Sequence, residues 1–151
     1  MDEQPEFVKV LFTDEDGNVE RLWATPVDQD RYQLENSPFY AYGVSWRDIV
    51  EARPNAPDEW PSFVRVIEKS GHRTIRIILD PPADQSPEAQ YILDTVVGMG
   101  CSFEGAHPGY LAIDIPPGTD FSNVCSYLRK TGQQWEHADP RYSDLYPEEE
   151  A

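Results

Sequence analysis

The segment SGHRTIR, residues 70–76, holds the polar constellation whose spacing is most suited to chemistry. Alternate side chains of an extended strand share a face about 7 Å apart, so His72, Thr74 and Arg76 should line up on one side. An imidazole, a hydroxyl and a guanidinium in one row could hold a phosphate or a carboxylate. The alternative, which we favour, is that Arg76 pairs with an acid, Asp48 first, across a junction between two halves of the chain.

Aromatic side chains gather in the segment ENSPFYAYGVSWRDIV, residues 35–50. Phe39 is expected in the core, but Tyr40, Tyr42 and Trp46 are too many for one small interior. At least one of them should be partly exposed, and exposed aromatics on an acidic surface are typical anchors for a protein partner. A tyrosine lid over the end of a barrel is the structural alternative. The acids that could flank such anchors are Asp28 and Asp30, or Asp58 and Glu59.

The spacing of the other reactive side chains does not match the patterns of catalytic or metal-binding sites. His72, His107 and His137 fall in different expected elements, and no Cys-x-x-Cys or His-x-His pattern is present. Cys101 and Cys125 are expected to be buried thiols in a reducing compartment. The first strand-to-helix connection, DPPADQSP, is proline-rich and acidic, unlike a phosphate-binding loop. We therefore expect no catalytic residue, no metal and no cofactor.

Charge is the strongest compositional signal, with 28 acidic residues against 12 basic ones and a formal net charge of −16. Residues 1–72 hold 15 acids and 7 bases, and residues 73–151 hold 13 acids and 5 bases, so each half carries −8. Such a field repels nucleic acid and anionic membranes, and it attracts a basic protein. A bias of the whole proteome is the alternative, since three lysines stand beside nine arginines.

The elements that must position these residues change character near Gly71. Residues 1–72 contain short β-branched or aromatic runs separated by Gly, Pro, Asn and Asp clusters. This pattern predicts a small β-rich half, built as a bent antiparallel sheet or a partial β-barrel. The expected strands are 7–13, 19–25, 31–36, 48–53 and 62–70.

Residues 73–147 alternate between strand and helix signals. Ser86 should cap one helix that stops at Gly100, and Asp120 should cap a second that stops at Gly132. The expected strands around them are 73–80, 101–107, 110–116 and 133–138. The resulting βαββαβ order predicts a ferredoxin-like half, and the fold class is α+β. Residues 148–151 are expected to form a frayed acidic tail.

A membrane or secreted protein is not expected from this sequence. No apolar run approaches the roughly 18 to 20 residues that a membrane span requires. The N-terminal segment MDEQPEFVKV is acidic, where a signal peptide would be basic and then apolar. We therefore predict a cytoplasmic protein.

Several motifs also occur in a characteristic order over nearly the whole chain: VKVLF, LWA, ENSPFYAYGVSWRDIVEA, SGHRTIRI, GMGCSFEG, YLAIDIPP and WEH. In these motifs the sequence resembles the bacterial domain-of-unknown-function family 4265. The resemblance implies no activity, because that of the family is unassigned. Trp46 and Arg47 stand before Asp48 where the family suggests a glycine, which predicts a bulkier turn with Trp46 outside. The shared residues are turn, core and junction types, which favours a scaffold: Asn36, Pro38, Phe39, Asp48, Gly71, His72, Thr74 and Arg76.

We therefore predict an acidic protein that binds a basic protein partner stoichiometrically and does not bind nucleic acid or membranes. The specific form is an immunity protein that neutralises a basic, secreted bacterial toxin domain. The alternative is a small-ligand-binding regulatory domain, similar to amino-acid sensors with the βαββαβ order, although DPPADQSP lacks the glycine that those domains place there. An enzyme built on His72, Thr74 and Arg76 is third.

Overall fold

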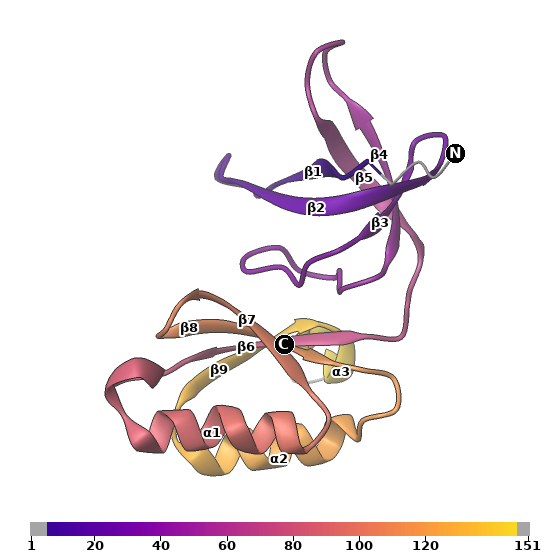
Figure 1. The fold of residues 1–151 in the computed structure, drawn as a ribbon. Helices are drawn as coiled ribbons and strands as arrows, with labels where there is room; N and C mark the ends of the chain where they lie inside the picture. The colour runs from indigo at the N-terminus through magenta and orange to yellow at the C-terminus, as the bar shows by residue number, and fades with distance from the viewer. Residues whose placement is uncertain (1–5, 148–151) are drawn as a thin grey trace, which may run out of the picture.

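The computed structural model describes residues 6–147, so the expected frayed tail at 148–151 lies outside the described residues. Two strand-rich parts lie one above the other (Figure 1). A five-stranded barrel forms the first part, and a four-stranded sheet with two longer helices forms the second. The mixture of mostly strands and few helices agrees with the predicted α+β class.

The barrel is an up-and-down arrangement in which neighbours along the chain pair antiparallel. β1 and β5 also pair in parallel, at Leu11 and Ser62, which closes the barrel. The predicted bent sheet is confirmed with five strands, and it closes fully where the sequence predicted at most a partial barrel. With an odd number of alternating strands, the first and last strands run in the same direction, so closure requires a parallel pair. The strands are β1 Val8–Thr13, β2 Val19–Asp28, β3 Arg31–Leu34, β4 Ile49–Pro54 and β5 Pro61–Glu68.

The barrel encloses its own apolar core because alternate side chains of each strand point inward. Val10, Leu22, Leu34 and Val50 are fully or almost fully buried there. Val44 joins this core from the long loop between β3 and β4. That loop is therefore anchored to the barrel interior near its middle.

The second part has the predicted order of strands and helices, and all of its strand pairs are antiparallel, in the order β7-β8-β6-β9. Ser86 and Asp120 cap the two longer helices, as predicted, by accepting from the backbone N–H groups of Ala89 and Asn123. The short helices η1 and α3 were not predicted. The elements are β6 Arg73–Ile78, η1 Ala83–Gln85, α1 Pro87–Gly98, β7 Ser102–His107, β8 Tyr110–Ile115, α2 Phe121–Thr131, β9 Gln134–Asp139 and α3 Tyr142–Leu145.

The two faces of this sheet carry different side chains. Helices α1 and α2 cover one face, where Ile75 and Ile77 belong to an apolar core (Figure 1). The opposite face points toward the barrel and carries Thr74, Arg76 and Asp114, all of them buried. Because side chains alternate along a strand, the single strand β6 supplies both surfaces. In residues 6–147, no helix has the length and apolar character needed to cross a membrane.

Candidate functional site

The candidate site is the junction between the two parts, built around residues 35–48, which we call the junction loop. Glu20 of β2 holds this loop from the barrel side. Its carboxylate accepts hydrogen bonds from the backbone N–H groups of Phe39 at 2.6 Å, Tyr40 at 3.1 Å and Ala41 at 2.8 Å. One carboxylate therefore fixes three consecutive residues of the loop.

The second sheet holds the same loop from its other side. Glu104 of β7 accepts from the backbone N–H of Ser37 at 2.6 Å. Arg76 of β6 donates through Nη1 to the carbonyl oxygens of Pro38 at 3.3 Å and Ala41 at 2.8 Å. The Arg76 side chain is only 1% exposed, so these bonds are shielded from water.

The predicted ion pair between Arg76 and Asp48 is wrong. Nε of Arg76 lies 2.9 Å from Oε2 of Glu136, which stands directly across from it on β9. A cross-strand neighbour in the same sheet is closer than any acid of the barrel. Arg76 still joins the two parts, but through backbone carbonyl groups. Tyr42 completes the group by donating its hydroxyl to Oε1 of Glu136 at 2.5 Å, and this hydrogen bond raises the pKa of Tyr42.

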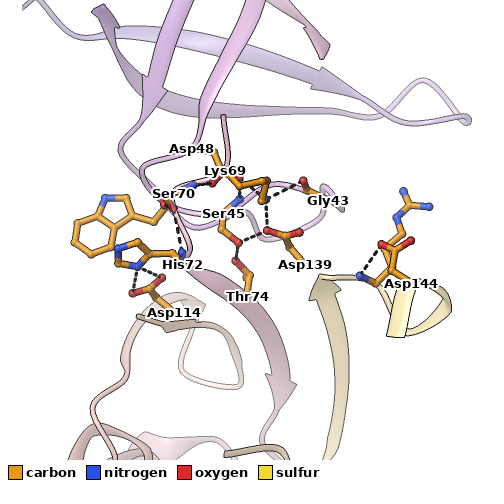
Figure 2. Close-up of polar contacts among 12 residues, drawn as sticks. Gly43, Ser45, Asp48, Lys69, Ser70, His72, Thr74, Asp114, Asp139 and Asp144 are labelled. Carbon is orange, nitrogen blue, oxygen red and sulfur yellow. Dashed lines mark hydrogen bonds and ion pairs between the residues drawn. The ribbon is translucent and has the colours of Figure 1, made fainter. Parts of the chain in front are cut away.

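Asp48 is fully buried and forms a second connection between the two parts. It accepts from the backbone N–H groups of Ser45 at 2.9 Å and Ser70 at 2.8 Å. Lys69, directly after β5, forms ion pairs with Asp48 and with Asp139 of β9 (Figure 2). Sequence reasoning missed Lys69, although its place at the end of a strand that leads into the junction was the available signal.

Ser45 and Thr74 meet at the centre of this junction. The Ser45 hydroxyl donates to Oδ2 of Asp139 at 2.5 Å, and it lies 2.7 Å from the Thr74 hydroxyl (Figure 2). Both residues are fully buried. A hydroxyl that no solvent-borne substrate can reach is not suited to nucleophilic catalysis, so the arrangement supports a structural role.

His72, directly before β6, has different partners from Thr74 and Arg76. Its Nδ1 lies 2.9 Å from Oδ1 of Asp114 (Figure 2). Its ring meets the Trp46 ring edge-on, with 5.0 Å between the ring centroids. Burial raises the pKa of Asp114, and the contact with His72 opposes that effect. His72, Thr74 and Arg76 therefore have different partners and do not converge on one anion.

The three aromatic candidates differ in how much surface they present. Tyr40 is 65% exposed, and its ring stacks on that of Tyr110 with 5.8 Å between centroids. Tyr42 is 43% exposed, but its hydroxyl is already engaged within the junction. Trp46 is half-buried against His72, so the prediction that Trp46 lies outside holds only in part. Tyr40 is the candidate anchor that the structure leaves most accessible.

The four acids predicted to flank the aromatics do not do so. They lie at the end of β2, in the turn to β3 and in the turn from β4 to β5, whereas the junction loop joins β3 to β4. In an up-and-down barrel, successive turns fall at alternate ends, so these acids lie at the end opposite the loop. Glu20, at the backbone of Phe39 and Tyr40, and Glu136, at the Tyr42 hydroxyl, are the carboxylates that contact these aromatic residues. The four displaced acids are Asp28, Asp30, Asp58 and Glu59.

Other reactive groups are inert or isolated in the described part of the chain. Cys101 and Cys125 are free and buried, as predicted, and burial raises the pKa of the Cys101 thiol to about 11. Almost no reactive thiolate is therefore present near neutral pH. Within residues 6–147, no group of three or more His, Cys, Asp or Glu side chains is arranged to hold a metal ion.

Comparisons with known proteins agree with this fold and assign no activity. The model of the family described as "Domain of unknown function (DUF4265)" matches residues 20–138. No curated protein matches the chain. A solved structure, the "Novel crystal structure of a hypothetical protein from Neisseria gonorrhoeae", is similar with a TM-score of 0.70 and 19% sequence identity, over 95% of this chain and 100% of that chain. At this identity the likeness shows the fold alone.

Proposed function

We propose that this chain, which belongs to the DUF4265 family, binds a basic protein partner stoichiometrically and catalyses no reaction. The specific form that we propose is an immunity protein that neutralises a basic toxin domain. A protein of this kind must only recognise and cover its target. A buried junction that holds the loop in place and an exposed aromatic anchor are sufficient for that task.

The observation that carries the proposal is the presentation of Tyr40. Its side chain is 65% exposed, while its backbone N–H is held by Glu20 and its ring stacks on Tyr110. An aromatic side chain that is already positioned loses little conformational freedom on binding. Rigid tyrosines of this kind are common among the residues that dominate interface energies.

The charge around this anchor is suited to a basic surface. Glu20 binds backbone N–H groups and forms no ion pair with a basic side chain in the described range, so its negative charge is not cancelled. The whole chain carries −16. Such a field accelerates encounter with a positively charged protein, and the apolar anchor is then needed for slow dissociation.

The small-ligand alternative has its own support. The order β6-α1-β7-β8-α2-β9, with strands side by side as β7-β8-β6-β9, supports the interpretation of the second part as a ferredoxin-like unit. Regulatory domains with this order bind small molecules. A hollow beside β9 favours this second candidate function.

The test is a pull-down with the tagged chain from the cells that express it, at low and at high salt, followed by purification of the captured protein. The purified partner should be basic, should bind in a one-to-one titration and should associate more slowly as salt rises. The Debye length falls from about 10 Å at 0.1 M to about 3 Å at 1 M. Tyr40→Ala should weaken binding of the purified partner. Its control is Tyr91→Ala, at an exposed tyrosine of α1.

Two results would contradict the proposal. The first is that no protein partner is recovered at either salt concentration while the purified chain turns over a small molecule, which would favour an enzyme. The second is a partner whose association rate does not depend on salt.

A further inference from the structure

A hollow of about 600 Å³ lies along β9, at the edge of the second sheet. Trp135 and His137 of β9 form part of its wall, and Tyr42 enters from the junction loop. Arg129 of α2 and Arg141, directly before α3, lie on its other sides. Four separate segments of the chain therefore converge on this site.

Both arginines of the hollow lie against aromatic rings. Cζ of Arg129 lies 5.9 Å from the centroid of Trp135, and Cζ of Arg141 lies 5.0 Å from that of Tyr42. Within residues 6–147 neither guanidinium forms an ion pair with a carboxylate, which is also true of Arg21, Arg31 and Arg73. In a chain with 28 acids and 12 bases, two arginines without an ion pair among the described residues therefore face one hollow.

One acid also lines the hollow, but its charge is already compensated. Glu136 pairs with Nε of Arg76 at 2.9 Å and accepts from the Tyr42 hydroxyl at 2.5 Å. Its repulsion toward an incoming anion is correspondingly reduced. The positive charge of Arg129 and Arg141 is therefore the charge available to a ligand.

The aromatic walls favour a flat ligand. Trp135 meets His137 edge-on at 4.9 Å, and His137 is 7% exposed, so the two rings brace each other. Nδ1 of His137 is buried and has no hydrogen-bond partner among the described residues. Planar groups stack on tryptophan and tyrosine faces, and guanidinium groups bind carboxylate and phosphate oxygens in the same plane.

We propose that this hollow binds a small anion that carries a planar ring, a chemistry shared by aromatic carboxylates and nucleotides. The arginines bind the anionic group, and Trp135 and Tyr42 contact the ring. The site is separate from the Tyr40 anchor, so this inference does not depend on the proposed partner binding.

The test is isothermal titration of the full chain with four probes. Phenylacetate and adenosine monophosphate combine a ring with an anion, adenosine has the ring alone, and inorganic phosphate has the anion alone. At least one ring-bearing anion should bind about tenfold or more tightly than either single-feature probe, since hydrogen bonds to charged groups contribute about 1.5–3 kcal/mol each. The arm that binds identifies whether a carboxylate or a phosphate is recognised.

The double variant Arg129→Gln/Arg141→Gln should weaken that binding by about tenfold or more. The control is Arg47→Gln, because Arg47 also lies over an aromatic ring, 5.4 Å from the Trp46 centroid, but outside the hollow. Tyr40→Ala should leave the affinity unchanged. Absence of binding by both ring-bearing probes at millimolar concentration would overturn the proposal. The proposal would also be overturned if inorganic phosphate bound as tightly as the ring-bearing anions. The same holds if Arg47→Gln lost as much affinity as the double variant.

Discussion

One face of the four-stranded sheet packs on α1 and α2 through apolar side chains, whereas the other meets the barrel and the junction loop through polar ones. Ile75 and Ile77 of β6 lie in the first contact, and Thr74 and Arg76 of the same strand lie in the second. All four are buried. The two contacts thus differ in chemistry and not in exclusion of water.

This difference separates two physical roles. Apolar burial is nondirectional and scales with area, so the helix face contributes stability with modest geometric demands. Hydrogen bonds and buried ion pairs contribute less net free energy, but they require particular distances and angles. The polar face is therefore suited to fix how the barrel and the junction loop sit on the sheet, and with them the position of Tyr40.

The largest expected effect comes from the apolar face. Ile77→Ala should lower the free energy of unfolding by about 2–5 kcal/mol, because it removes buried methyl groups and leaves a cavity. Ile78→Ala is a matched control, since Ile78 is the next residue but is partly exposed on the opposite face. Chemical denaturation measures both. Equal losses would show that the helix face has no special part in stability.

The next effect comes from the polar face. Arg76→Ala should cost about 1–3 kcal/mol, because the carbonyl groups of Pro38 and Ala41 lose their buried donor. The control is Arg65→Ala, whose Nε lies 2.8 Å from Glu51 on an exposed surface. That exposed pair should contribute much less, because solvent screens it. Similar losses for the two variants in denaturant unfolding would contradict a buried role for Arg76.

A smaller effect should appear in the pH dependence of stability. Burial lowers the pKa of His137, which lies on the helix face, so the unfolded imidazole binds a proton more readily than the folded one. Stability should therefore fall as the pH drops through about 6.5. Asp114, on the polar face, has a raised pKa and acts in the opposite direction.

The difference in pH-dependent stability between the wild type and His137→Gln isolates the contribution of His137. The free energy of unfolding, measured above and below pH 6.5, should fall more steeply with decreasing pH in the wild type than in His137→Gln. A variant with the same slope as the wild type would show that His137 is free to take up a proton in the folded state.

The strands and the two longer helices were predictable from the sequence because their signals are local. Strand alternation, the caps at Ser86 and Asp120, and the left-handed Gly132 all act within a few residues. Closure of the barrel was not predictable, because it depends on the count and direction of all five strands together.

The partners within the site were harder to predict for the same reason. The sequence placed Arg76 and Asp48 at the junction, but the Arg76 pair with Glu136 depends on the register between β6 and β9. Glu104 reaches Ser37 across 67 positions of the chain. No local pattern marks either contact, and both follow from how the two parts meet.

The most direct test of the binding account is the dissociation rate of the purified partner from Tyr40→Ala and from Tyr91→Ala. Tyr40 and Tyr91 are 65% and 67% exposed, so the two variants remove similar surface from different faces. If Tyr40 is the anchor, its loss should raise the dissociation rate by about tenfold or more, since anchor residues contribute about 2 kcal/mol or more. Tyr91→Ala should dissociate like the wild type. Equal rates for the two variants would contradict the claim that the junction loop binds the partner.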